Sequence, residues 1–242
     1  MHNPALVAER NMLALGENPY PGRGIVIGTD KTGKYMVQVY WIEGRSPNSR
    51  NRVLTEKDGA VFTEAADPAK MKDPKLIIYN AMRERGPRYV VSNGDQTDTV
   101  IQGIRSRYNL MDTMMEREYE PDEPNFTPRI TGLCSLDSLD PRFQLAILRR
   151  SPWGTCERHF FTYEQVAAGF GYCIHTYMGD SDPLLSWHGE PLLMPLKGGI
   201  EEIAASYWDK LDEANRVSLA VKFIHMELGV SDTNIVNKYT KV

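Results

Sequence analysis

The chain has 242 residues, which is long enough to bury a large core, and no linker divides it. Its net charge is −4. Mild negative charge and scattered basic residues argue against nucleic-acid binding and a membrane-binding face, although local arginines can still hold a small anion. No apolar run approaches the roughly 20 residues of a membrane span, and the N-terminus lacks signal-peptide regions, so we expect a cytoplasmic protein.

The N-terminal part predicts a short helix followed by a β-hairpin. Residues 5–15 have weak helical periodicity, and Asn18–Gly22 breaks the chain before the β-branched run Arg23–Gly28. A second strand is predicted over Tyr35–Ile42. The glycines lie before the first strand and at its end, whereas a dinucleotide-binding loop needs them after a strand and at the start of a helix. A Rossmann fold is therefore excluded.

A polar loop, Gly44–Arg52, follows the hairpin and carries three arginines within eight residues. Guanidinium groups in such a loop suit a phosphate or a carboxylate, and a solvated basic loop explains the same residues equally well. Short strands are predicted over residues 53–55 and 60–63.

A second hairpin is predicted over Leu76–Met82 and Arg88–Ser92. Alternation places Tyr79 on one strand face and Asn80 on the other, and by this pattern alone Tyr79 is a core residue. Ser92–Asp98 then forms a strand-to-helix junction, with a helix expected to about Tyr108. Its free N–H groups suit an anion, although capping accounts for the same residues.

A short helix over Leu110–Glu118 leads into the loop Tyr119–Ile130, which combines three acids, three prolines and an arginine. Proline fixes φ and removes a backbone donor, so this loop is rigid and can hold ionised groups in place. A surface turn of solvated acids is the alternative.

The remaining elements complete an order of strands, helices, strands and helices. Strands are predicted over residues 130–136, 143–148, 156–163 and 172–177, and two amphipathic helices over residues 200–211 and 217–228. This order predicts an α+β fold of two antiparallel sheets packed face to face, with helices on both outer sides. Cys134, Cys156 and Cys173 form no C-x-x-C pair, which argues against a disulfide framework and a zinc site.

Several motifs together resemble the archaeal-type IMP cyclohydrolases, in the same order and at similar spacings. They are Tyr20 with Gly22-Arg23, Asn51-Arg52, Tyr79-Asn80, Ser92-Asn93-Gly94 with Thr97-Asp98, Tyr119-Glu120, Thr127-Pro128-Arg129-Ile130 and Thr176-Tyr177. The resemblance spans about residues 20–177, and we expect one domain over residues 1–242 with a divergent, helical C-terminal part from about residue 180.

The resemblance implies a four-layer αββα sandwich similar to the N-terminal nucleophile hydrolases, without their nucleophile. Met1-His2 likewise offers no Ser, Thr or Cys. The implied reaction closes the purine ring of 5-formamidoimidazole-4-carboxamide ribonucleotide to give inosine monophosphate (IMP) and water, with no metal and no cofactor. A non-catalytic protein that binds purine nucleotides, or an interaction protein that uses the C-terminal helices, is the alternative. We also expect a homo-oligomer.

The resemblance also implies roles for individual residues. Arg52, Tyr79 and Glu120 would be catalytic, with Glu120 transferring protons, Tyr79 donating to the developing oxygen and Arg52 giving electrostatic support, although Tyr79 and Glu120 could exchange roles. The implied substrate-binding residues are Arg23, Arg45, Asn80, Asn93, Gly94, Asp98, Thr127 and Arg129. Two features depart from the family: the longer arginine loop leaves Arg50 as an alternative to Arg52, and Gln96 stands where histidine is frequent.

Overall fold

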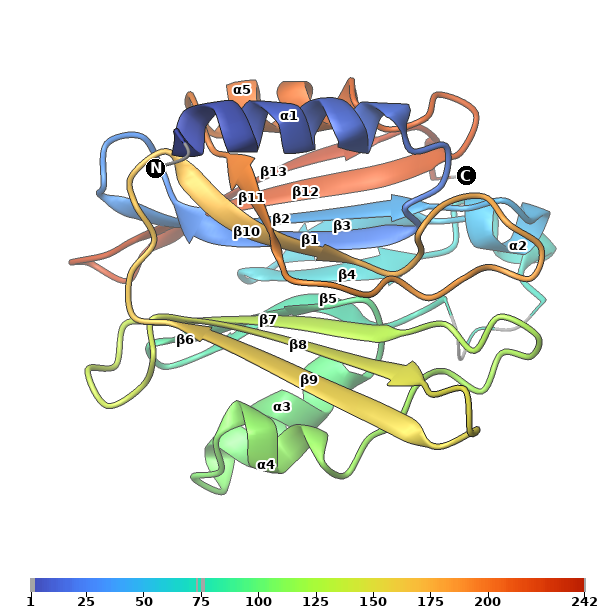
Figure 1. The fold of residues 1–242 in the computed structure, drawn as a ribbon, viewed down its shortest axis with the longest axis horizontal. Coiled ribbons are helices and arrows are strands. Elements are labelled where there is room, and N and C mark those ends of the chain that lie inside the picture. Colours follow the sequence, from blue (N-terminus) through green and yellow to red (C-terminus); the bar gives the residue numbers. More distant parts are fainter. Residues whose placement is uncertain (1–2, 73, 75–76, 242) are drawn as a thin grey trace.

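The computed structural model describes residues 3–72, 74 and 77–241, and two antiparallel β-sheets dominate it (Figure 1). Met1, His2 and Leu76, which were considered above, lie outside these residues. The first sheet has the order β11-β10-β1-β2-β12-β13 and the second the order β3-β4-β5-β6-β7-β8-β9. The strands of the first sheet are β1 (Arg23–Thr29), β2 (Tyr35–Glu43), β10 (Phe170–His175), β11 (Leu192–Pro195), β12 (Arg216–His225) and β13 (Ser231–Asn237).

The second sheet contains the strands predicted from the middle of the chain. They are β3 (Val53–Lys57), β4 (Ala60–Glu64), β5 (Asn80–Arg85), β6 (Arg88–Ser92), β7 (Arg129–Ser135), β8 (Phe143–Arg150) and β9 (Cys156–Tyr163). The inner faces of the two sheets pack on each other through a large apolar core that includes Ile25, Tyr40, Val91 and Leu145. Alternation along β2 sends Tyr40 into this core and its neighbour Trp41 to the opposite face.

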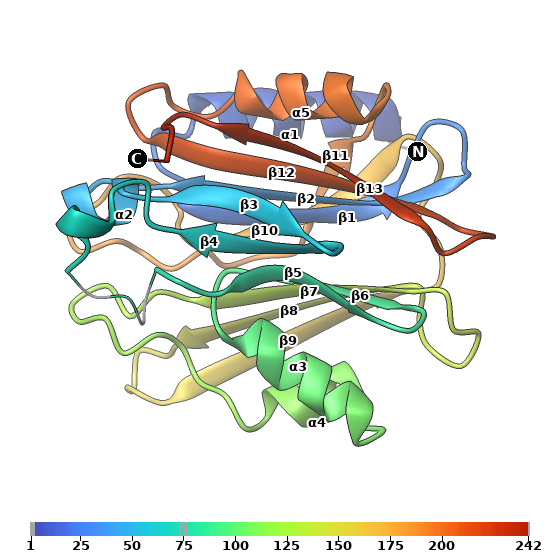
Figure 2. The same ribbon diagram turned by 180° about the vertical axis from the view of Figure 1, so that it is seen from behind.

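Helices cover the outer face of each sheet, which gives four layers in the order αββα (Figures 1 and 2). On the first sheet lie α1 (Pro4–Glu17) and α5 (Ile200–Trp208), whose apolar side chains pack on Val37 and Trp41. On the second lie α3 (Gln96–Arg105) and α4 (Leu110–Met114). A one-turn helix α2 (Pro47–Arg50) and the 3-10 turn η1 (Pro68–Lys70) lie in connections. The predicted layer order is confirmed.

The C-terminal part corrects one prediction, because residues 217–228 do not form a helix. Arg216–His225 is strand β12, which pairs with β2 on one side and β13 on the other. Leu219, Val221 and Phe223 face the helices while Val217, Ala220 and Ile224 face the second sheet, so both strand faces are buried. A strand buried on both faces is an almost continuous apolar run, which resembles a helix in periodicity. Strand β11 is a further strand that the sequence pattern did not predict.

Candidate active site

The candidate site lies where three loops meet at one end of the sandwich. Arg45 Nη1, in the arginine loop, lies 2.5 Å from Asp180 Oδ1, and the Leu184 backbone N–H donates to Asn125 Oδ1 at 3.2 Å. A cavity of about 260 Å³ lies between these segments. Its lining residues are Tyr20, Arg23, Arg45, Ser46, Asn48, Ser49, Ile77, Asp122, Asn125, Tyr177 and Leu184.

Gly22 sets the turn that brings the chain past this cavity into β1. Its φ of +77° lies in the left-handed region, where side chains are strained. A Cβ there would also lie 2.2 Å from Thr176 Oγ1 and 2.6 Å from Tyr177 Cδ2. Thr176 Oγ1 in turn accepts from the Arg23 backbone N–H at 3.1 Å. Gly22 therefore lets the backbone pass close to the Thr176 and Tyr177 side chains, and the bond to Thr176 holds the Arg23 backbone there.

Arg52 is the least satisfied charged residue of the site. Its side chain is 0% exposed, and Nε donates to the Ser49 carbonyl at 2.8 Å. Both terminal nitrogens, Nη1 and Nη2, are buried without a hydrogen-bond partner among the described residues, as is Nε of Arg23. Burial, and then the positive charge of Arg23, lower the pKa of the Arg52 guanidinium. A fully buried arginine beside a partly buried one, each with an unpaired donor among the described residues, forms a site suited to an anion.

The structure also separates Arg52 from Arg50, which the sequence left as alternatives. Arg50 turns away from the cavity: its Nε donates to the Gly44 carbonyl at 2.8 Å, and its Nη2 donates to Asn215 Oδ1 at 3.0 Å. Arg52 is the residue whose terminal donors, on Nη1 and Nη2, have no partner among the described residues. The geometry therefore favours Arg52 over Arg50 as a residue that meets a ligand.

Tyr79 lies immediately before β5 and faces the core between the sheets. Its hydroxyl is 2.6 Å from the hydroxyl of Tyr40 on β2, and both side chains are buried. Burial raises the pKa of Tyr40 well above its ordinary value, while Arg23 and Arg52 oppose that shift. The two phenols thus lie in the field of the two arginines. Sequence analysis missed Tyr40, although its alternation with Met36 and Ile42 marks it as a buried phenol that needs a partner.

Glu120 is held by Arg129 in a two-point ion pair, with Nη1–Oε1 at 2.7 Å and Nη2–Oε2 at 3.0 Å. Arg129 Nη1 also contacts Asp95 Oδ1 at 2.6 Å. Burial raises the pKa of the Glu120 carboxyl, against the opposing effects of Arg129 and Arg23 and with a further rise from Asp95. A carboxylate held in this way is a better proton acceptor than an exposed one. Arg23 therefore influences both the phenol pair and Glu120.

Gln96 and Asn93 hold Arg129 of this ion pair through hydrogen bonds. Gln96 Nε2 donates to Asn93 Oδ1 at 2.9 Å, while Gln96 Oε1 accepts from Arg129 Nη1 at 2.7 Å. Asn93 Oδ1 also accepts from the Ile130 backbone N–H at 2.8 Å. Gly94 leaves room for the pair, because a Cβ there would lie 2.9 Å from both Arg129 Nη1 and Glu120 Oε1. Gln96, the departure from the family, thus has a structural role here.

Thr127 ties the acidic loop to the cavity. Its hydroxyl lies 2.5 Å from the Tyr177 hydroxyl and also contacts the Asp122 carboxylate. The Glu120 backbone N–H donates to the Thr127 carbonyl at 2.9 Å, which fixes the course of the loop. Tyr177 stacks on Tyr20 with ring centroids 5.8 Å apart, and Arg45 lies over the Tyr20 ring. Aromatic faces and cations therefore line the same cavity.

The predicted residues are not all brought together. Arg23 and Arg45 line the cavity. Arg52 and Tyr79 are buried and Glu120 is partly buried, and none of the three lines it. Asn80 and Asp98 lie elsewhere: Asn80 Nδ2 donates to both carboxylate oxygens of Asp98 at 3.0 Å. Because Asp98 belongs to α3, this pair lies on the outer face of the second sheet, opposite to Tyr79.

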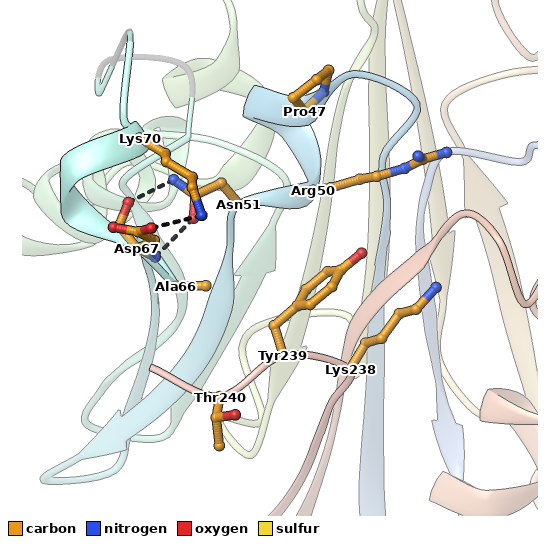
Figure 3. Close-up of a pocket in the computed structure, with 9 residues that line it drawn as sticks. All are labelled: Pro47, Arg50, Asn51, Ala66, Asp67, Lys70, Lys238, Tyr239 and Thr240. Atoms are coloured by element: carbon orange, nitrogen blue, oxygen red, sulfur yellow. Dashed lines mark hydrogen bonds and ion pairs between the residues drawn. The ribbon is translucent and has the colours of Figure 1, made fainter. Parts of the chain in front are cut away.

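A second cavity, of about 430 Å³, lies between α2, the segment around η1 and residues 238–240 (Figure 3). Its basic residues are Arg50, Lys70 and Lys238, and each already has a protein partner: Lys70 is paired with Asp67 at 2.9 Å, and Lys238 Nζ donates to the Glu213 carbonyl at 2.6 Å. The Asn51 side chain is bonded to the Asp67 backbone: its Nδ2 donates to the Asp67 carbonyl at 2.8 Å, and its Oδ1 accepts from the Asp67 N–H at 2.8 Å. Arg23 and Arg45 line the first cavity and do not line this one, so we place the active site at the first.

The described part of the chain contains neither a candidate metal site nor a candidate membrane-spanning helix. Residues 3–72, 74 and 77–241 hold no group of three or more His, Cys, Asp or Glu side chains placed to bind a metal ion. Within the same ranges, every helix is too short or too polar to cross a membrane.

Comparison with known proteins gives one family. The model of a family described as "IMP cyclohydrolase-like protein" matches residues 20–228. A protein named IMP cyclohydrolase from Haloquadratum walsbyi is 32% identical over 123 residues, covering 49% of this chain and 58% of the relative. A protein of the same name from Methanosphaera stadtmanae is 35% identical over 118 residues, covering 47% and 56%. The chain thus spans less than two thirds of the length of these curated relatives.

Proposed function

The chain belongs to the IMP cyclohydrolase-like family, and from that premise we propose that it is an IMP cyclohydrolase. It would close the ring of 5-formamidoimidazole-4-carboxamide ribonucleotide to form IMP with loss of water, as a step of purine biosynthesis. The nucleophile and the electrophile lie on one molecule, so the protein must mainly orient them and move protons.

The observation that carries this proposal is the pair of arginines formed by buried Arg52 and partly buried Arg23. Arg52 is fully buried, and its two terminal nitrogens lack partners in the described chain, next to Arg23. Buried donors left without partners cost folding free energy, so their retention points to a ligand that accepts hydrogen bonds and carries negative charge. A ribonucleotide meets both conditions, and the stacked Tyr20 and Tyr177 rings suit its heterocycle.

In the first step, the carboxamide nitrogen attacks the formyl carbon. A nitrogen–carbon bond forms, the C=O π electrons move to oxygen, and Glu120 accepts the proton that leaves the nitrogen. Tyr79 donates its hydroxyl proton to the developing oxyanion, and Arg52 stabilises the negative charge. The raised pKa of the Glu120 carboxyl makes it a stronger base for this transfer.

In the second step, the carbinol oxygen leaves as water. The carbon–oxygen bond breaks as protonated Glu120 returns its proton to the leaving oxygen, and the former formamido nitrogen gives its proton to the Tyr79 phenolate. Both residues return to their starting states, so no external acid, base or co-reactant is consumed. We assign substrate contacts to Arg23, Arg45 and Thr127, and support of Glu120 to Arg129, Asn93 and Gly94.

The test is to supply the formylated ribonucleotide to the purified protein and to follow purine absorbance. Glu120→Gln and Tyr79→Phe should each lower kcat by about a hundredfold, as expected when a proton-transfer group or an oxyanion donor is removed. Arg83→Gln is a matched control, because Arg83 pairs with Asp98 on the outer face of the second sheet. Wild-type rates in both site variants would remove these residues from the mechanism. IMP-dependent stabilisation without any turnover would instead indicate a binding protein.

We further propose that residues 1–242 act as one domain, in the cytoplasm and as a homo-oligomer. Light scattering of the purified chain tests the last point, because a monomeric mass at working concentration would contradict it.

A further inference from the structure

The hydrogen bond between Tyr40 and Tyr79 joins the two sheets directly. Tyr40 lies on β2, an inner strand of the first sheet, and its backbone is aligned with Ile25 on one side and Ala220 on the other. Tyr79 precedes β5 of the second sheet. Pairing on both edges fixes Tyr40, whereas Tyr79 lies where its strand begins. The 2.6 Å contact therefore sets the position of the Tyr79 hydroxyl from a rigid base.

The direction of this hydrogen bond follows from the number of donors. A phenol has one O–H donor, and either hydroxyl of the pair could use it on the other. If Tyr79 gives its hydrogen to a substrate oxygen, only Tyr40 can donate within the pair. Among the described residues, the Tyr40 hydroxyl has no other hydrogen-bond partner, so its donor is free for Tyr79.

We propose that Tyr40 is a positioning residue that donates a hydrogen bond to Tyr79 and strengthens Tyr79 as the donor to the reacting oxygen. This inference rests on the proposed cyclohydrolase function. As Tyr79 transfers its proton, negative charge develops on its oxygen, and a hydrogen bond to a charged acceptor is stronger than one to a neutral phenol. The Tyr40 bond is therefore stronger in the transition state than in the ground state, which is the condition for acceleration.

Tyr40 is well suited to remain the donor. It is fully buried, and burial raises the pKa of its hydroxyl, so it keeps its proton across the working pH range. The groups that face it are Tyr79, Arg23 and Arg52, of which the two arginines favour a negative oxygen nearby. The same charges that oppose the rise in the Tyr40 pKa also stabilise a developing Tyr79 phenolate, and the donor hydrogen of Tyr40 orients it.

The experiment is a double-mutant cycle with the formylated ribonucleotide as substrate. Tyr40→Phe keeps the ring and removes one hydroxyl, and it should lower kcat by about ten- to a hundredfold, the range for one hydrogen bond to a charged group. KM and the IMP-induced rise in melting temperature should stay unchanged. In a Tyr79→Phe background, Tyr40→Phe should cause no further loss. The control is Tyr89→Phe, a buried phenol of the same core that donates to the Gly229 carbonyl.

The outcomes separate this inference from the proposed function. An active wild type with unchanged kcat in Tyr40→Phe overturns the role of Tyr40 alone, and so do losses that multiply in the double variant. A wild type without cyclohydrolase activity overturns the proposed function and this inference with it. If Tyr40→Phe does not fold, 3-fluorotyrosine at position 40 keeps the bond with a stronger donor. It should raise kcat, and a lower or equal kcat overturns the inference.

Discussion

Replacing Arg52 with methionine should stabilise the ligand-free protein while abolishing its activity. Arg52 is fully buried, and its Nη1 and Nη2 have no partner among the described residues. Methionine fills similar space with an unbranched apolar chain, and it removes the charge that faces Arg23. A residue kept for a ligand is expected to cost stability when that ligand is absent.

The magnitude follows from the contacts of the guanidinium. Each buried donor without a partner costs about 1–3 kcal/mol, and the single bond from Nε to the Ser49 carbonyl returns about 1 kcal/mol. We therefore expect a net gain of about 2 kcal/mol, within the range of about 1–4 kcal/mol seen when buried charged groups are replaced by apolar ones. For a chain of this size that gain corresponds to a rise in Tm of about 4–8 °C.

The assay is thermal unfolding with and without IMP, with Arg129→Met as the matched control. Arg129 is also buried, but it pairs with Glu120 and Asp95, so its removal leaves a buried carboxylate unpaired. That change should lower stability by about 3 kcal/mol or more. IMP should raise the Tm of the wild type and leave that of Arg52→Met unchanged.

A lower Tm for Arg52→Met would refute the reasoning, because it would mean that the guanidinium stabilises the fold through interactions of its own. Equal shifts of the same sign in the two arginine variants would also refute it, since the argument depends on one residue being paired and the other not.

Two further predictions concern residues that flank the site. Glu43 is buried, and burial raises the pKa of its carboxyl from 4.5 to about 9, so its contribution to stability is complete below about pH 4.5 and is lost progressively as the pH rises to about 9. Between pH 5 and 8, the free energy of unfolding of the wild type, measured in urea, should fall by up to about 1.4 kcal/mol per pH unit because of Glu43, and Glu43→Gln should lack this fall. Parallel plots of unfolding free energy against pH for the wild type and the variant would contradict this. Gly22→Ala should lower the free energy of unfolding by about 2–4 kcal/mol, because φ is left-handed and the added Cβ would clash with Thr176. Gly86→Ala, where φ is +56° and the space is open, should lower it by about 1 kcal/mol. Equal losses of stability in the two variants would remove the clash from the explanation.

Local patterns in the sequence predict most elements of the fold and most of their order. The period-two alternation of β1, β2, β5 and β6 depends on neighbouring residues alone, and the prolines of the 119–130 loop exclude regular structure locally. The same local logic failed at β12, because a strand covered on both faces has no polar side to reveal its period. Only the positions of β2, β13 and α5 decide that this run is extended.

The site divides in the same way. The chain supplied arginines, a phenol and a carboxylate in segments that resemble a known family, but local order could not tell Arg50 from Arg52 or pair Tyr40 with Tyr79. Those two phenols are 39 positions apart and belong to different sheets, so only the packing of one sheet on the other brings their hydroxyls to 2.6 Å. Likewise, strand alternation separates Asn80 from Tyr79, and the docking of α3 gives Asn80 its partner Asp98. The order of residues gives the types of side chain available to the site. The distances between those side chains arise when the apolar faces of the two sheets are buried against each other.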